Sequence, residues 1–384
     1  MPKKDCISDD KNTQPNPKQP QEQLQPQADI QAIQKALQPL GWNQARIKCL
    51  AAFLVAILTV QSVSLVRLAN VFPTEATKKS AYKRLQRFLK DFSPNLDVLA
   101  CFLAQLCKIP APWNLSMDRT NWKLGKKHLN ILMLSIVAPG ITFPLMWMPL
   151  SKQGKNKDGK TGNSNTKERI ELMERFLKVF GSQCCRNLFA DREFAGRDFL
   201  KWLEDNDIKY CIRLKSNIVT LNNSGESVHI SEYFKNSVGK ENVLGFRKIL
   251  GKSRFVTGTR LEDGDYLIVV SSAEVDLEEY ALRWGIETMF GSFKTRGFHL
   301  EATHVTDPAR LGNLIALMAI AYTWAGAFGG WVVSQVKLRC LKHERAAICL
   351  FRLGLDELQN WMLSLCRTIN ECQKQKALQF LSCT

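Results

Sequence analysis

Three consecutive segments with the pattern of β-strands lie near the middle of the chain and most constrain its fold. Residues 113–118 alternate between polar and apolar side chains, and two apolar runs follow, Leu129–Val137 and Ile141–Met148. Pro139-Gly140 lies between these two runs, and such a dipeptide is typical of a tight turn. Short turns join antiparallel strands, because a parallel pair needs a long crossover. The sequence therefore predicts three antiparallel strands in succession.

The elements that follow predict a mixed α/β sheet with helices on its faces. Asn165 and Glu168 have the spacing of a capping box, which predicts a helix through Phe180. Farther along we expect a short apolar strand, a helix, another strand, a turn-rich β insertion and a long helix, at 187–190, 196–206, 208–215, about 218–275 and 276–294. The domain predicted in this way spans residues 111–310.

The two ends of the chain differ from this domain in composition and in hydrophobic periodicity. Residues 1–30 hold five of the fourteen prolines and six glutamines, so we expect a disordered tail. Residues 31–110 show helical periodicity, as does the region 311–384, where helices could serve dimerisation. The clearest early helix has one apolar face, and its basic residues, which include Lys83, Arg84 and Arg87, lie largely off that face. The apolar face consists of Ala81, Leu85, Phe88, Leu89 and Phe92. A basic amphipathic helix suits DNA contact, and a solvated basic face is the alternative.

Charge and composition point to a polyanionic partner. Lys and Arg number 53 against 36 Asp and Glu, a formal net charge of +17, which favours nucleic acid first and an acidic membrane surface second. The twelve cysteines form no C-x-x-C pair, so we expect reduced thiols and a cytoplasmic setting. The uncharged run Asn313–Val336 is long enough to cross a bilayer, but we expect a helix buried inside a large domain and no membrane partner.

Two aspartates are the first candidates for chemistry. Asp118 shares a strand face with Ser116, whereas Leu115 and Met117 share the other, and Asp191 ends the apolar run before it. A carboxylate at the end of a buried strand is useful at an open sheet edge. Two of them on adjacent strands would bind a hard divalent cation such as Mg²⁺. The alternative for either residue alone is a turn or cap.

The predicted helix at 276–294 supplies further candidates. Tyr280, Arg283, Glu287 and Lys294 fall within a stripe about 60° wide on a regular α-helix. Glu287 would close the metal site, while Arg283 and Lys294 would hold phosphates. Arg283 and Glu287 also have the i, i+4 spacing of an ordinary surface ion pair, but Lys294 is too far along the axis to join it.

The spacing Tyr280-x₂-Arg283-x₃-Glu287-x₆-Lys294 resembles the signature of the fourth family of bacterial insertion-sequence transposases, which are DDE enzymes with an RNase H-like core. The likeness extends to the segments that begin at Asp118 and Asp191 and to residues 297–304, and it covers about residues 110–325. It implies that Asp118, Asp191 and Glu287 form an acidic triad, and that Tyr280, Arg283 and Lys294 hold the transposon end. Trp284 resembles the aromatic residue beside the family's arginine.

The resemblance also implies cut-and-paste transposition of an insertion sequence by two-metal phosphoryl transfer, with Mg²⁺ or Mn²⁺ held by the triad and a hairpin intermediate. The partners would be double-stranded transposon ends and target DNA, with a homodimer in the synaptic complex. In relatives the β insertion supports the hairpin, and Phe246 and Phe255 are weak candidates for stacking on a flipped base. The protein would act in the bacterial cytoplasm, at the nucleoid.

Three other functions compete with this interpretation. One is a catalytically inactive DNA-binding regulator, and another is a different RNase H-like nuclease or recombinase. A third comes from residues 154–161, which match the P-loop pattern of NTPases by letter. A P-loop needs a helix that starts at its lysine, and the residues after Thr161 oppose one, so a chance match in a Gly- and Lys-rich loop is the better explanation.

Overall fold

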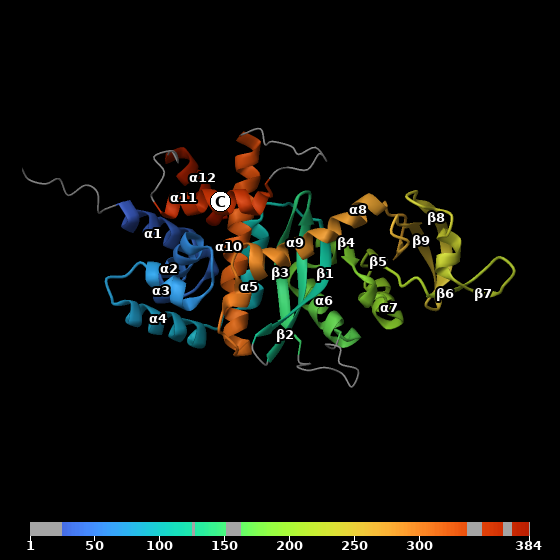
Figure 1. Ribbon diagram of the computed structural model, residues 1–384, viewed down its shortest axis with the longest axis horizontal. Helices are drawn as coiled ribbons and strands as arrows, with labels where there is room; N and C mark the ends of the chain where they lie inside the picture. The colour runs from blue at the N-terminus through green and yellow to red at the C-terminus, as the bar shows by residue number, and fades with distance from the viewer. Residues whose placement is uncertain (1–24, 125–126, 151–162, 336–347, 364–370, 384) are drawn as a thin grey trace, which may run out of the picture.

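The computed structural model describes residues 25–124, 127–150, 163–335, 348–363 and 371–383 (Figure 1). The P-loop-like segment 154–161 lies outside these residues. The centre of the molecule is one eight-stranded sheet in the order β3-β2-β1-β4-β5-β10-β9-β8. The strands are β1 Trp113–Leu124, β2 Lys127–Ala138, β3 Ile141–Pro149, β4 Cys185–Ala190, β5 Tyr210–Arg213, β8 Asn242–Ile249, β9 Lys252–Arg260 and β10 Tyr266–Ser271. The expected mixed α/β sheet is confirmed.

The sheet changes direction at its centre. β3, β2 and β1 form the expected antiparallel meander, and the turn at Pro139-Gly140 joins the first two. β4 and β5 then run parallel to β1. The strands of the insertion do not form a separate sheet, because β10 pairs antiparallel with β5 and continues the same sheet through β9 and β8. Among the strands of the described residues, only β6 (Val219–Leu221) and β7 (Ser227–His229) pair apart from it.

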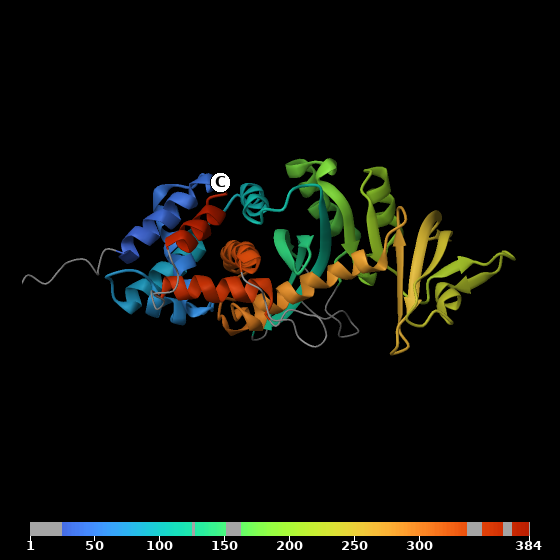
Figure 2. The ribbon, with the colours of Figure 1, turned by 90° about the horizontal axis from the view of Figure 1, so that it is seen from above.

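Helices cover both faces of this sheet. α6 (Thr166–Phe180) begins with the predicted capping box, since Asn165 and Glu168 each accept from the other's backbone N–H. α7 (Arg197–Asp205) packs beside it. In Figure 2 these two helices lie on one side of the strands, and the segment that contains α8 and α9 runs along the other.

The segment 277–296 is not the regular helix that the sequence predicts. It begins as α8 (Leu277–Ala281), tightens into a 3-10 turn over Leu282–Trp284, returns to α-helix in α9 (Gly285–Gly291) and widens into a π turn over Ser292–Arg296. A 3-10 turn over-winds a helix and a π turn under-winds it, so the two deviations act in opposite senses. Side chains far apart in this segment still face the same strands.

Helices from both ends of the chain pack as one bundle beside the sheet (Figures 1 and 2). They are α1 Gln25–Ala36, α2 Gln44–Val60, α3 Leu65–Val71, α4 Lys78–Asp91, α5 Leu96–Leu106, α10 Pro308–Gln335, α11 Leu350–Met362 and α12 Glu371–Leu381. α1 starts within the stretch expected to be a disordered tail, so that expectation is wrong for residues 25–30. The side chain of Asn313 in α10 joins the two ends, because it donates to the carbonyls of Leu89 and Phe92.

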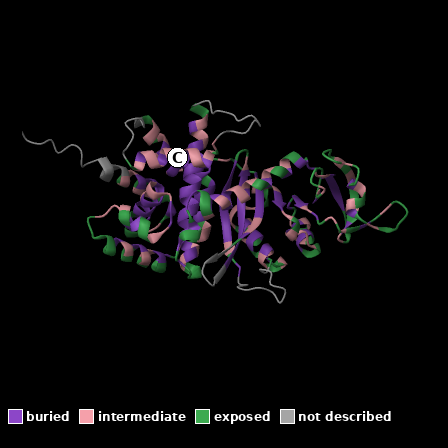
Figure 3. Ribbon diagram, in the orientation of Figure 1, coloured by how far each residue is buried: buried purple, intermediate pink, exposed green. Residues whose placement is uncertain are grey.

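α10 is the axis of the bundle. It is the one helix of the described residues that alone is long and apolar enough to cross a membrane, but 94% of its most apolar window is buried inside the protein (Figure 3). It packs against α2, α4, α5, α11, α12 and β3. Its crossing with α11 is a backbone contact, since a methyl group on Gly354 would overlap the carbonyl oxygen of Ala325. The sequence expectation of a buried core helix agrees with this packing.

Candidate active site

Asp118 and Asp191 are neighbours at the point where the parallel pairing of β1 with β4 ends. The register of β1 and β4 pairs Met117 with Ala190, the residues immediately before the two aspartates. Asp191 leaves the strand at the start of a short 3-10 turn, and its carbonyl accepts from the N–H of Phe194 at 2.9 Å. The parallel register therefore brings together two carboxyl groups that are far apart in the sequence.

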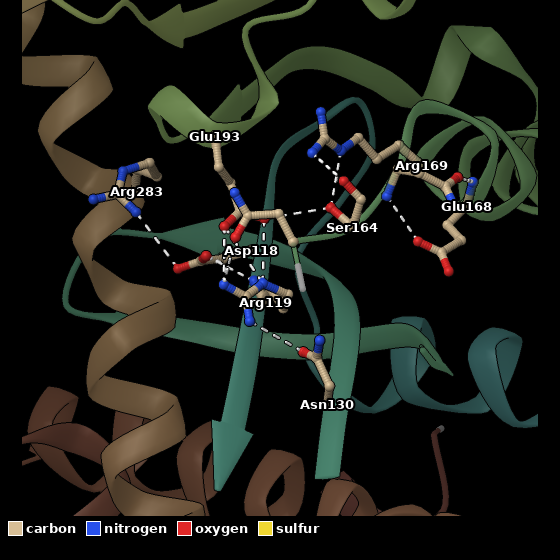
Figure 4. Close-up of polar contacts among 10 residues, drawn as sticks. Asp118, Arg119, Asn130, Ser164, Glu168, Arg169, Glu193 and Arg283 are labelled. Carbon is tan, nitrogen blue, oxygen red and sulfur yellow. Dashed lines mark hydrogen bonds and ion pairs between the residues drawn. The ribbon is translucent and has the colours of Figure 1, made fainter. Parts of the chain in front are cut away.

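Arg283 lies between these aspartates and Glu287. Its Nη2 donates to Oε1 of Glu287 at 3.0 Å. Its Nη1 lies 3.7 Å from Oδ2 of Asp118 (Figure 4). The Arg283 side chain is only 8% exposed, whereas that of Glu287 is 38% exposed. Carboxylates from β1 and α9 thus contact one buried guanidinium.

The electrostatics of the cluster reflect burial and crowding of like charges. Burial raises the pKa of Asp118 to about 6, against the lowering effects of the Arg119 N–H and of Arg283, while Glu287 and Glu193 raise it further. Burial would lower the pKa of Arg283, but Tyr280, Asp118, Asp191 and the hydrogen bond to Glu287 together raise it. All three acids of the expected triad therefore act on the same guanidinium.

A second ion pair ties the two aspartate-bearing segments together. Arg119 follows Asp118, Glu193 lies two residues after Asp191, and their side chains approach to 3.2 Å (Figure 4). Arg119 also donates to Asn130 at 3.4 Å, and Glu193 accepts from Ser164 at 3.3 Å. The sequence reasoning assigned no role to Arg119 or Glu193, although both stand within the segments that resemble the transposase family. Their position beside each aspartate was the available signal.

Tyr280 is buried, which does not fit the DNA contact expected for it. Its ring packs edge-on against Phe189, and its hydroxyl donates to the carbonyl of Ala190 at 3.1 Å. Tyr280 is 3% exposed, so in this conformation it supports the backbone just before Asp191. This placement assigns it a positioning role.

Lys294 and Trp284 are the other residues of this segment that the sequence predicts at the DNA. Nζ of Lys294 donates to the carbonyl of Asn121 in β1 at 2.8 Å, and burial lowers the pKa of Lys294, although Glu301 and Asp118 act to raise it. Trp284 is 63% exposed, and the guanidinium carbon of Arg283 lies 6.0 Å from the centre of its ring. Both residues are therefore placed beside the acids, one bonded to β1 and the other open to solvent.

The other expected DNA-binding residues lie on α4, in the helical bundle. Lys83, Arg84 and Arg87 are exposed on this helix, opposite the buried Ala81, Leu85 and Leu89, and the exposed face is visible in Figure 3. The structure does not bring them into contact with the acidic cluster. In the insertion Phe246 is 60% exposed on β8 and packs edge-on against the buried Phe255.

The donors of the cluster fit a hard divalent cation, although they do not enclose one as they stand. All three acids offer carboxylate oxygens, the ligand type that Mg²⁺ and Mn²⁺ prefer. Oδ1 of Asp191 is buried and has no hydrogen-bond partner among the described residues. Within that part of the chain, however, no three His, Cys, Asp or Glu side chains are close enough to hold a metal ion. The guanidinium of Arg283 contacts the oxygens that such an ion would need.

Comparisons with known proteins identify the family of the chain. No curated protein sequence matches the chain. The solved structures that resemble it include the cryo-EM structure of a piggyBac transposase synaptic complex with hairpin DNA, at 13% identity and a TM-score of 0.46, over 92% of this chain and 85% of that chain. The family model described as the transposase DDE domain matches residues 107–324, more than half of the chain, and this range includes Asp118, Asp191 and Glu287. The chain therefore belongs to the DDE transposase family and is a DNA transposase.

Proposed function

We propose that this transposase moves an insertion sequence by a cut-and-paste route, and that Asp118, Asp191 and Glu287 are its metal-binding triad. One observation carries the proposal: a single buried guanidinium contacts the carboxylates of Asp118 in β1 and Glu287 in α9, and Asp191 at the end of β4 acts to raise its pKa. Three acids from distant parts of the chain have no structural need to share one buried arginine. A site for divalent cations gives a reason for the arrangement.

The three acids would divide the work of holding metal. Asp118 and Asp191 come from rigid, paired strands and would fix one side of the site, and Glu287 would close it from the helix. Mg²⁺ or Mn²⁺ bound there would activate the attacking oxygen and stabilise the departing 3′ oxygen of DNA. Arg119 and Glu193 would keep the aspartates at a constant separation. Tyr280 would hold the strand end before Asp191.

The DNA would lie along the basic residues of the acidic cluster and of α4. Lys294 and Arg283 would contact the backbone beside the cut phosphate, Trp284 would lie against the DNA, and Lys83, Arg84 and Arg87 of α4 would contact it farther away. The strand order β3-β2-β1-β4-β5, with the acids at the centre, supports an RNase H-like core. We also propose that the reaction passes through a hairpin intermediate, ends with strand transfer into target DNA and takes place in a homodimeric synaptic complex. We further propose that the protein belongs to the fourth insertion-sequence family and acts at the bacterial nucleoid.

The test compares Glu287→Gln with Glu278→Gln, an exposed acid on α8 that serves as the matched control. The substrate is labelled duplex DNA that carries the inverted repeat flanking the gene. We expect Glu287→Gln to bind this end as the wild type does in a gel shift, and to give no cleavage with Mg²⁺. The control should bind and cleave normally. Cleavage by Glu287→Gln would remove Glu287 from the triad, and an inactive wild type would favour a DNA-binding regulator.

A further inference from the structure

Two buried arginines in this protein differ in how completely their donors are used. Arg254 in β9 has a side chain that is 2% exposed, and it donates to both carboxylate oxygens of Glu204, to the Tyr210 hydroxyl and to the carbonyls of Ile249 and Leu250. Arg283 is nearly as buried, but its Nε and Nη1 have no hydrogen-bond partner among the described residues. A buried guanidinium with idle donors is costly to keep in place.

The partners of Arg283 are also incompletely satisfied. Its contact with Asp118 is 3.7 Å, longer than a hydrogen bond, and Oδ1 of Asp191 has no partner in the described part of the chain. Among the described residues, Arg283 is the one cation that forms an ion pair with Asp118 or Glu287, and Lys294 donates instead to the carbonyl of Asn121. One guanidinium therefore balances only part of the charge that the three carboxylates carry when ionised.

A divalent cation and the guanidinium would compete for these oxygens. The one short hydrogen bond of Arg283 ends on Glu287, and its Nη1 faces Asp118, so it contacts two of the three carboxyl groups of the proposed triad. Two cations that approach the same oxygens repel each other strongly in a site from which water is largely excluded. When the cation arrives, Arg283 must turn away. The exposed ring of Trp284 lies 6.0 Å from it, on the side open to solvent.

We propose that Arg283 is an exchangeable counter-ion of the triad, which holds the acids together without metal and turns toward a DNA phosphate when the divalent cation displaces it. This inference rests on the proposed metal triad. Arg283 would contact the acids in the metal-free state and DNA in the metal-bound state. Metal and DNA would then strengthen each other's binding, because each favours the state in which Arg283 has left the carboxylates.

The first experiment measures Mn²⁺ binding to the full-length protein without DNA, from the electron paramagnetic resonance signal of free Mn²⁺. Arg283→Gln removes the competing charge and should bind Mn²⁺ about tenfold more tightly than the wild type. Arg283→Lys keeps the positive charge but lacks the planar guanidinium that spans two carboxylates, so it should also bind Mn²⁺ more tightly than the wild type. This second variant provides the test if Arg283→Gln does not fold. Arg186→Gln, an exposed arginine of β4, is the matched control and should not change the affinity.

The outcomes separate this inference from the function on which it rests. Glu287→Gln should lose the Mn²⁺ site. If it does, and neither Arg283 variant that folds binds Mn²⁺ more tightly than wild type, the counter-ion exchange is refuted and the triad stands. If Glu287→Gln binds Mn²⁺ as the wild type does, the metal triad is refuted and the exchange with it.

A second experiment measures the coupling directly. The affinity of the wild type for duplex DNA, followed by fluorescence anisotropy at constant ionic strength, should rise when Mn²⁺ replaces EDTA. In Arg283→Gln the affinity for DNA should be lower in both buffers, and the ratio of the affinity with Mn²⁺ to the affinity with EDTA should fall toward one. An unchanged ratio in the variant would show that Arg283 does not carry the coupling.

Discussion

The Tyr280→Phe variant distinguishes a positioning role from a DNA contact. It removes one oxygen atom from a residue that is 3% exposed, and with it the 3.1 Å hydrogen bond to the carbonyl of Ala190. A neutral hydrogen bond contributes about 1 kcal/mol, and an unsatisfied buried carbonyl adds to the loss, so we expect the variant to be about 1–2 kcal/mol less stable. In a domain of this size that corresponds to a fall in melting temperature of about 2–8 °C.

The functional effect of this variant should fall on cleavage and spare DNA binding. Without the hydroxyl the strand end before Asp191 is less firmly held, so cleavage with Mg²⁺ should slow while the gel shift of the transposon end stays at the wild-type level. Tyr233→Phe is the matched control, because its hydroxyl also donates to a backbone carbonyl, that of Leu221 at 3.4 Å, but in the insertion. It should leave cleavage unchanged. Weakened end binding with normal cleavage in Tyr280→Phe would refute the positioning role.

Three further predictions concern other parts of the molecule. Glu193→Gln should lower the free energy of unfolding by about 1–3 kcal/mol and slow cleavage without weakening end binding, because Arg119 loses its charged partner. Glu232→Gln, a change in an exposed ion pair, is the control and should alter neither stability nor cleavage. Normal cleavage by Glu193→Gln would contradict this role of the ion pair. Gly354→Ala should lower the free energy of unfolding in urea by about 1–3 kcal/mol, because α10 and α11 must separate, and wild-type stability would disprove their close approach. Burial would raise the pKa of Glu204, but hydrogen bonds from Arg254, Lys252 and Tyr210 lower it from 4.5 to about 2, so this carboxylate stabilises the fold above pH 4.5 and loses its effect as pH falls toward 2. Glu204→Gln should therefore be less stable than the wild type at pH 7, and the difference in the free energy of unfolding should decrease between pH 4.5 and pH 2. A difference that stays constant with pH would refute the lowered pKa of Glu204.

Much of the sheet was predictable because its signals are local. The capping box at Asn165 and Glu168, the turn at Pro139-Gly140 and the apolar run before Asp191 each depend on neighbours in the sequence. The pairing of β10 with β5 was not predictable, because strand order depends on contacts between distant segments. The alternation of side chains along a strand does not show which strand it pairs with. The sequence therefore indicates a β insertion at about 218–275 but not which strand of the sheet it would join.

The candidate site was predictable in its residues but only partly in its geometry. The helical stripe placed Arg283 beside Glu287 correctly, because an i, i+4 spacing survives a short irregular turn. The burial of Tyr280 could not be foreseen from the stripe, since it depends on Phe189 and Ala190 in β4. Nor does the pattern show that Arg283 contacts the acids themselves. That contact follows from how closely α9 packs against β1.

The most direct test of the central claim is a crystal structure of the protein soaked in Mn²⁺, with the ion located by its anomalous scattering. The account predicts a peak bonded to carboxylate oxygens of Asp118, Asp191 and Glu287, with Arg283 turned away from them. A peak at other residues, or none beside these three acids while Arg283 keeps its contact with Glu287, would contradict it.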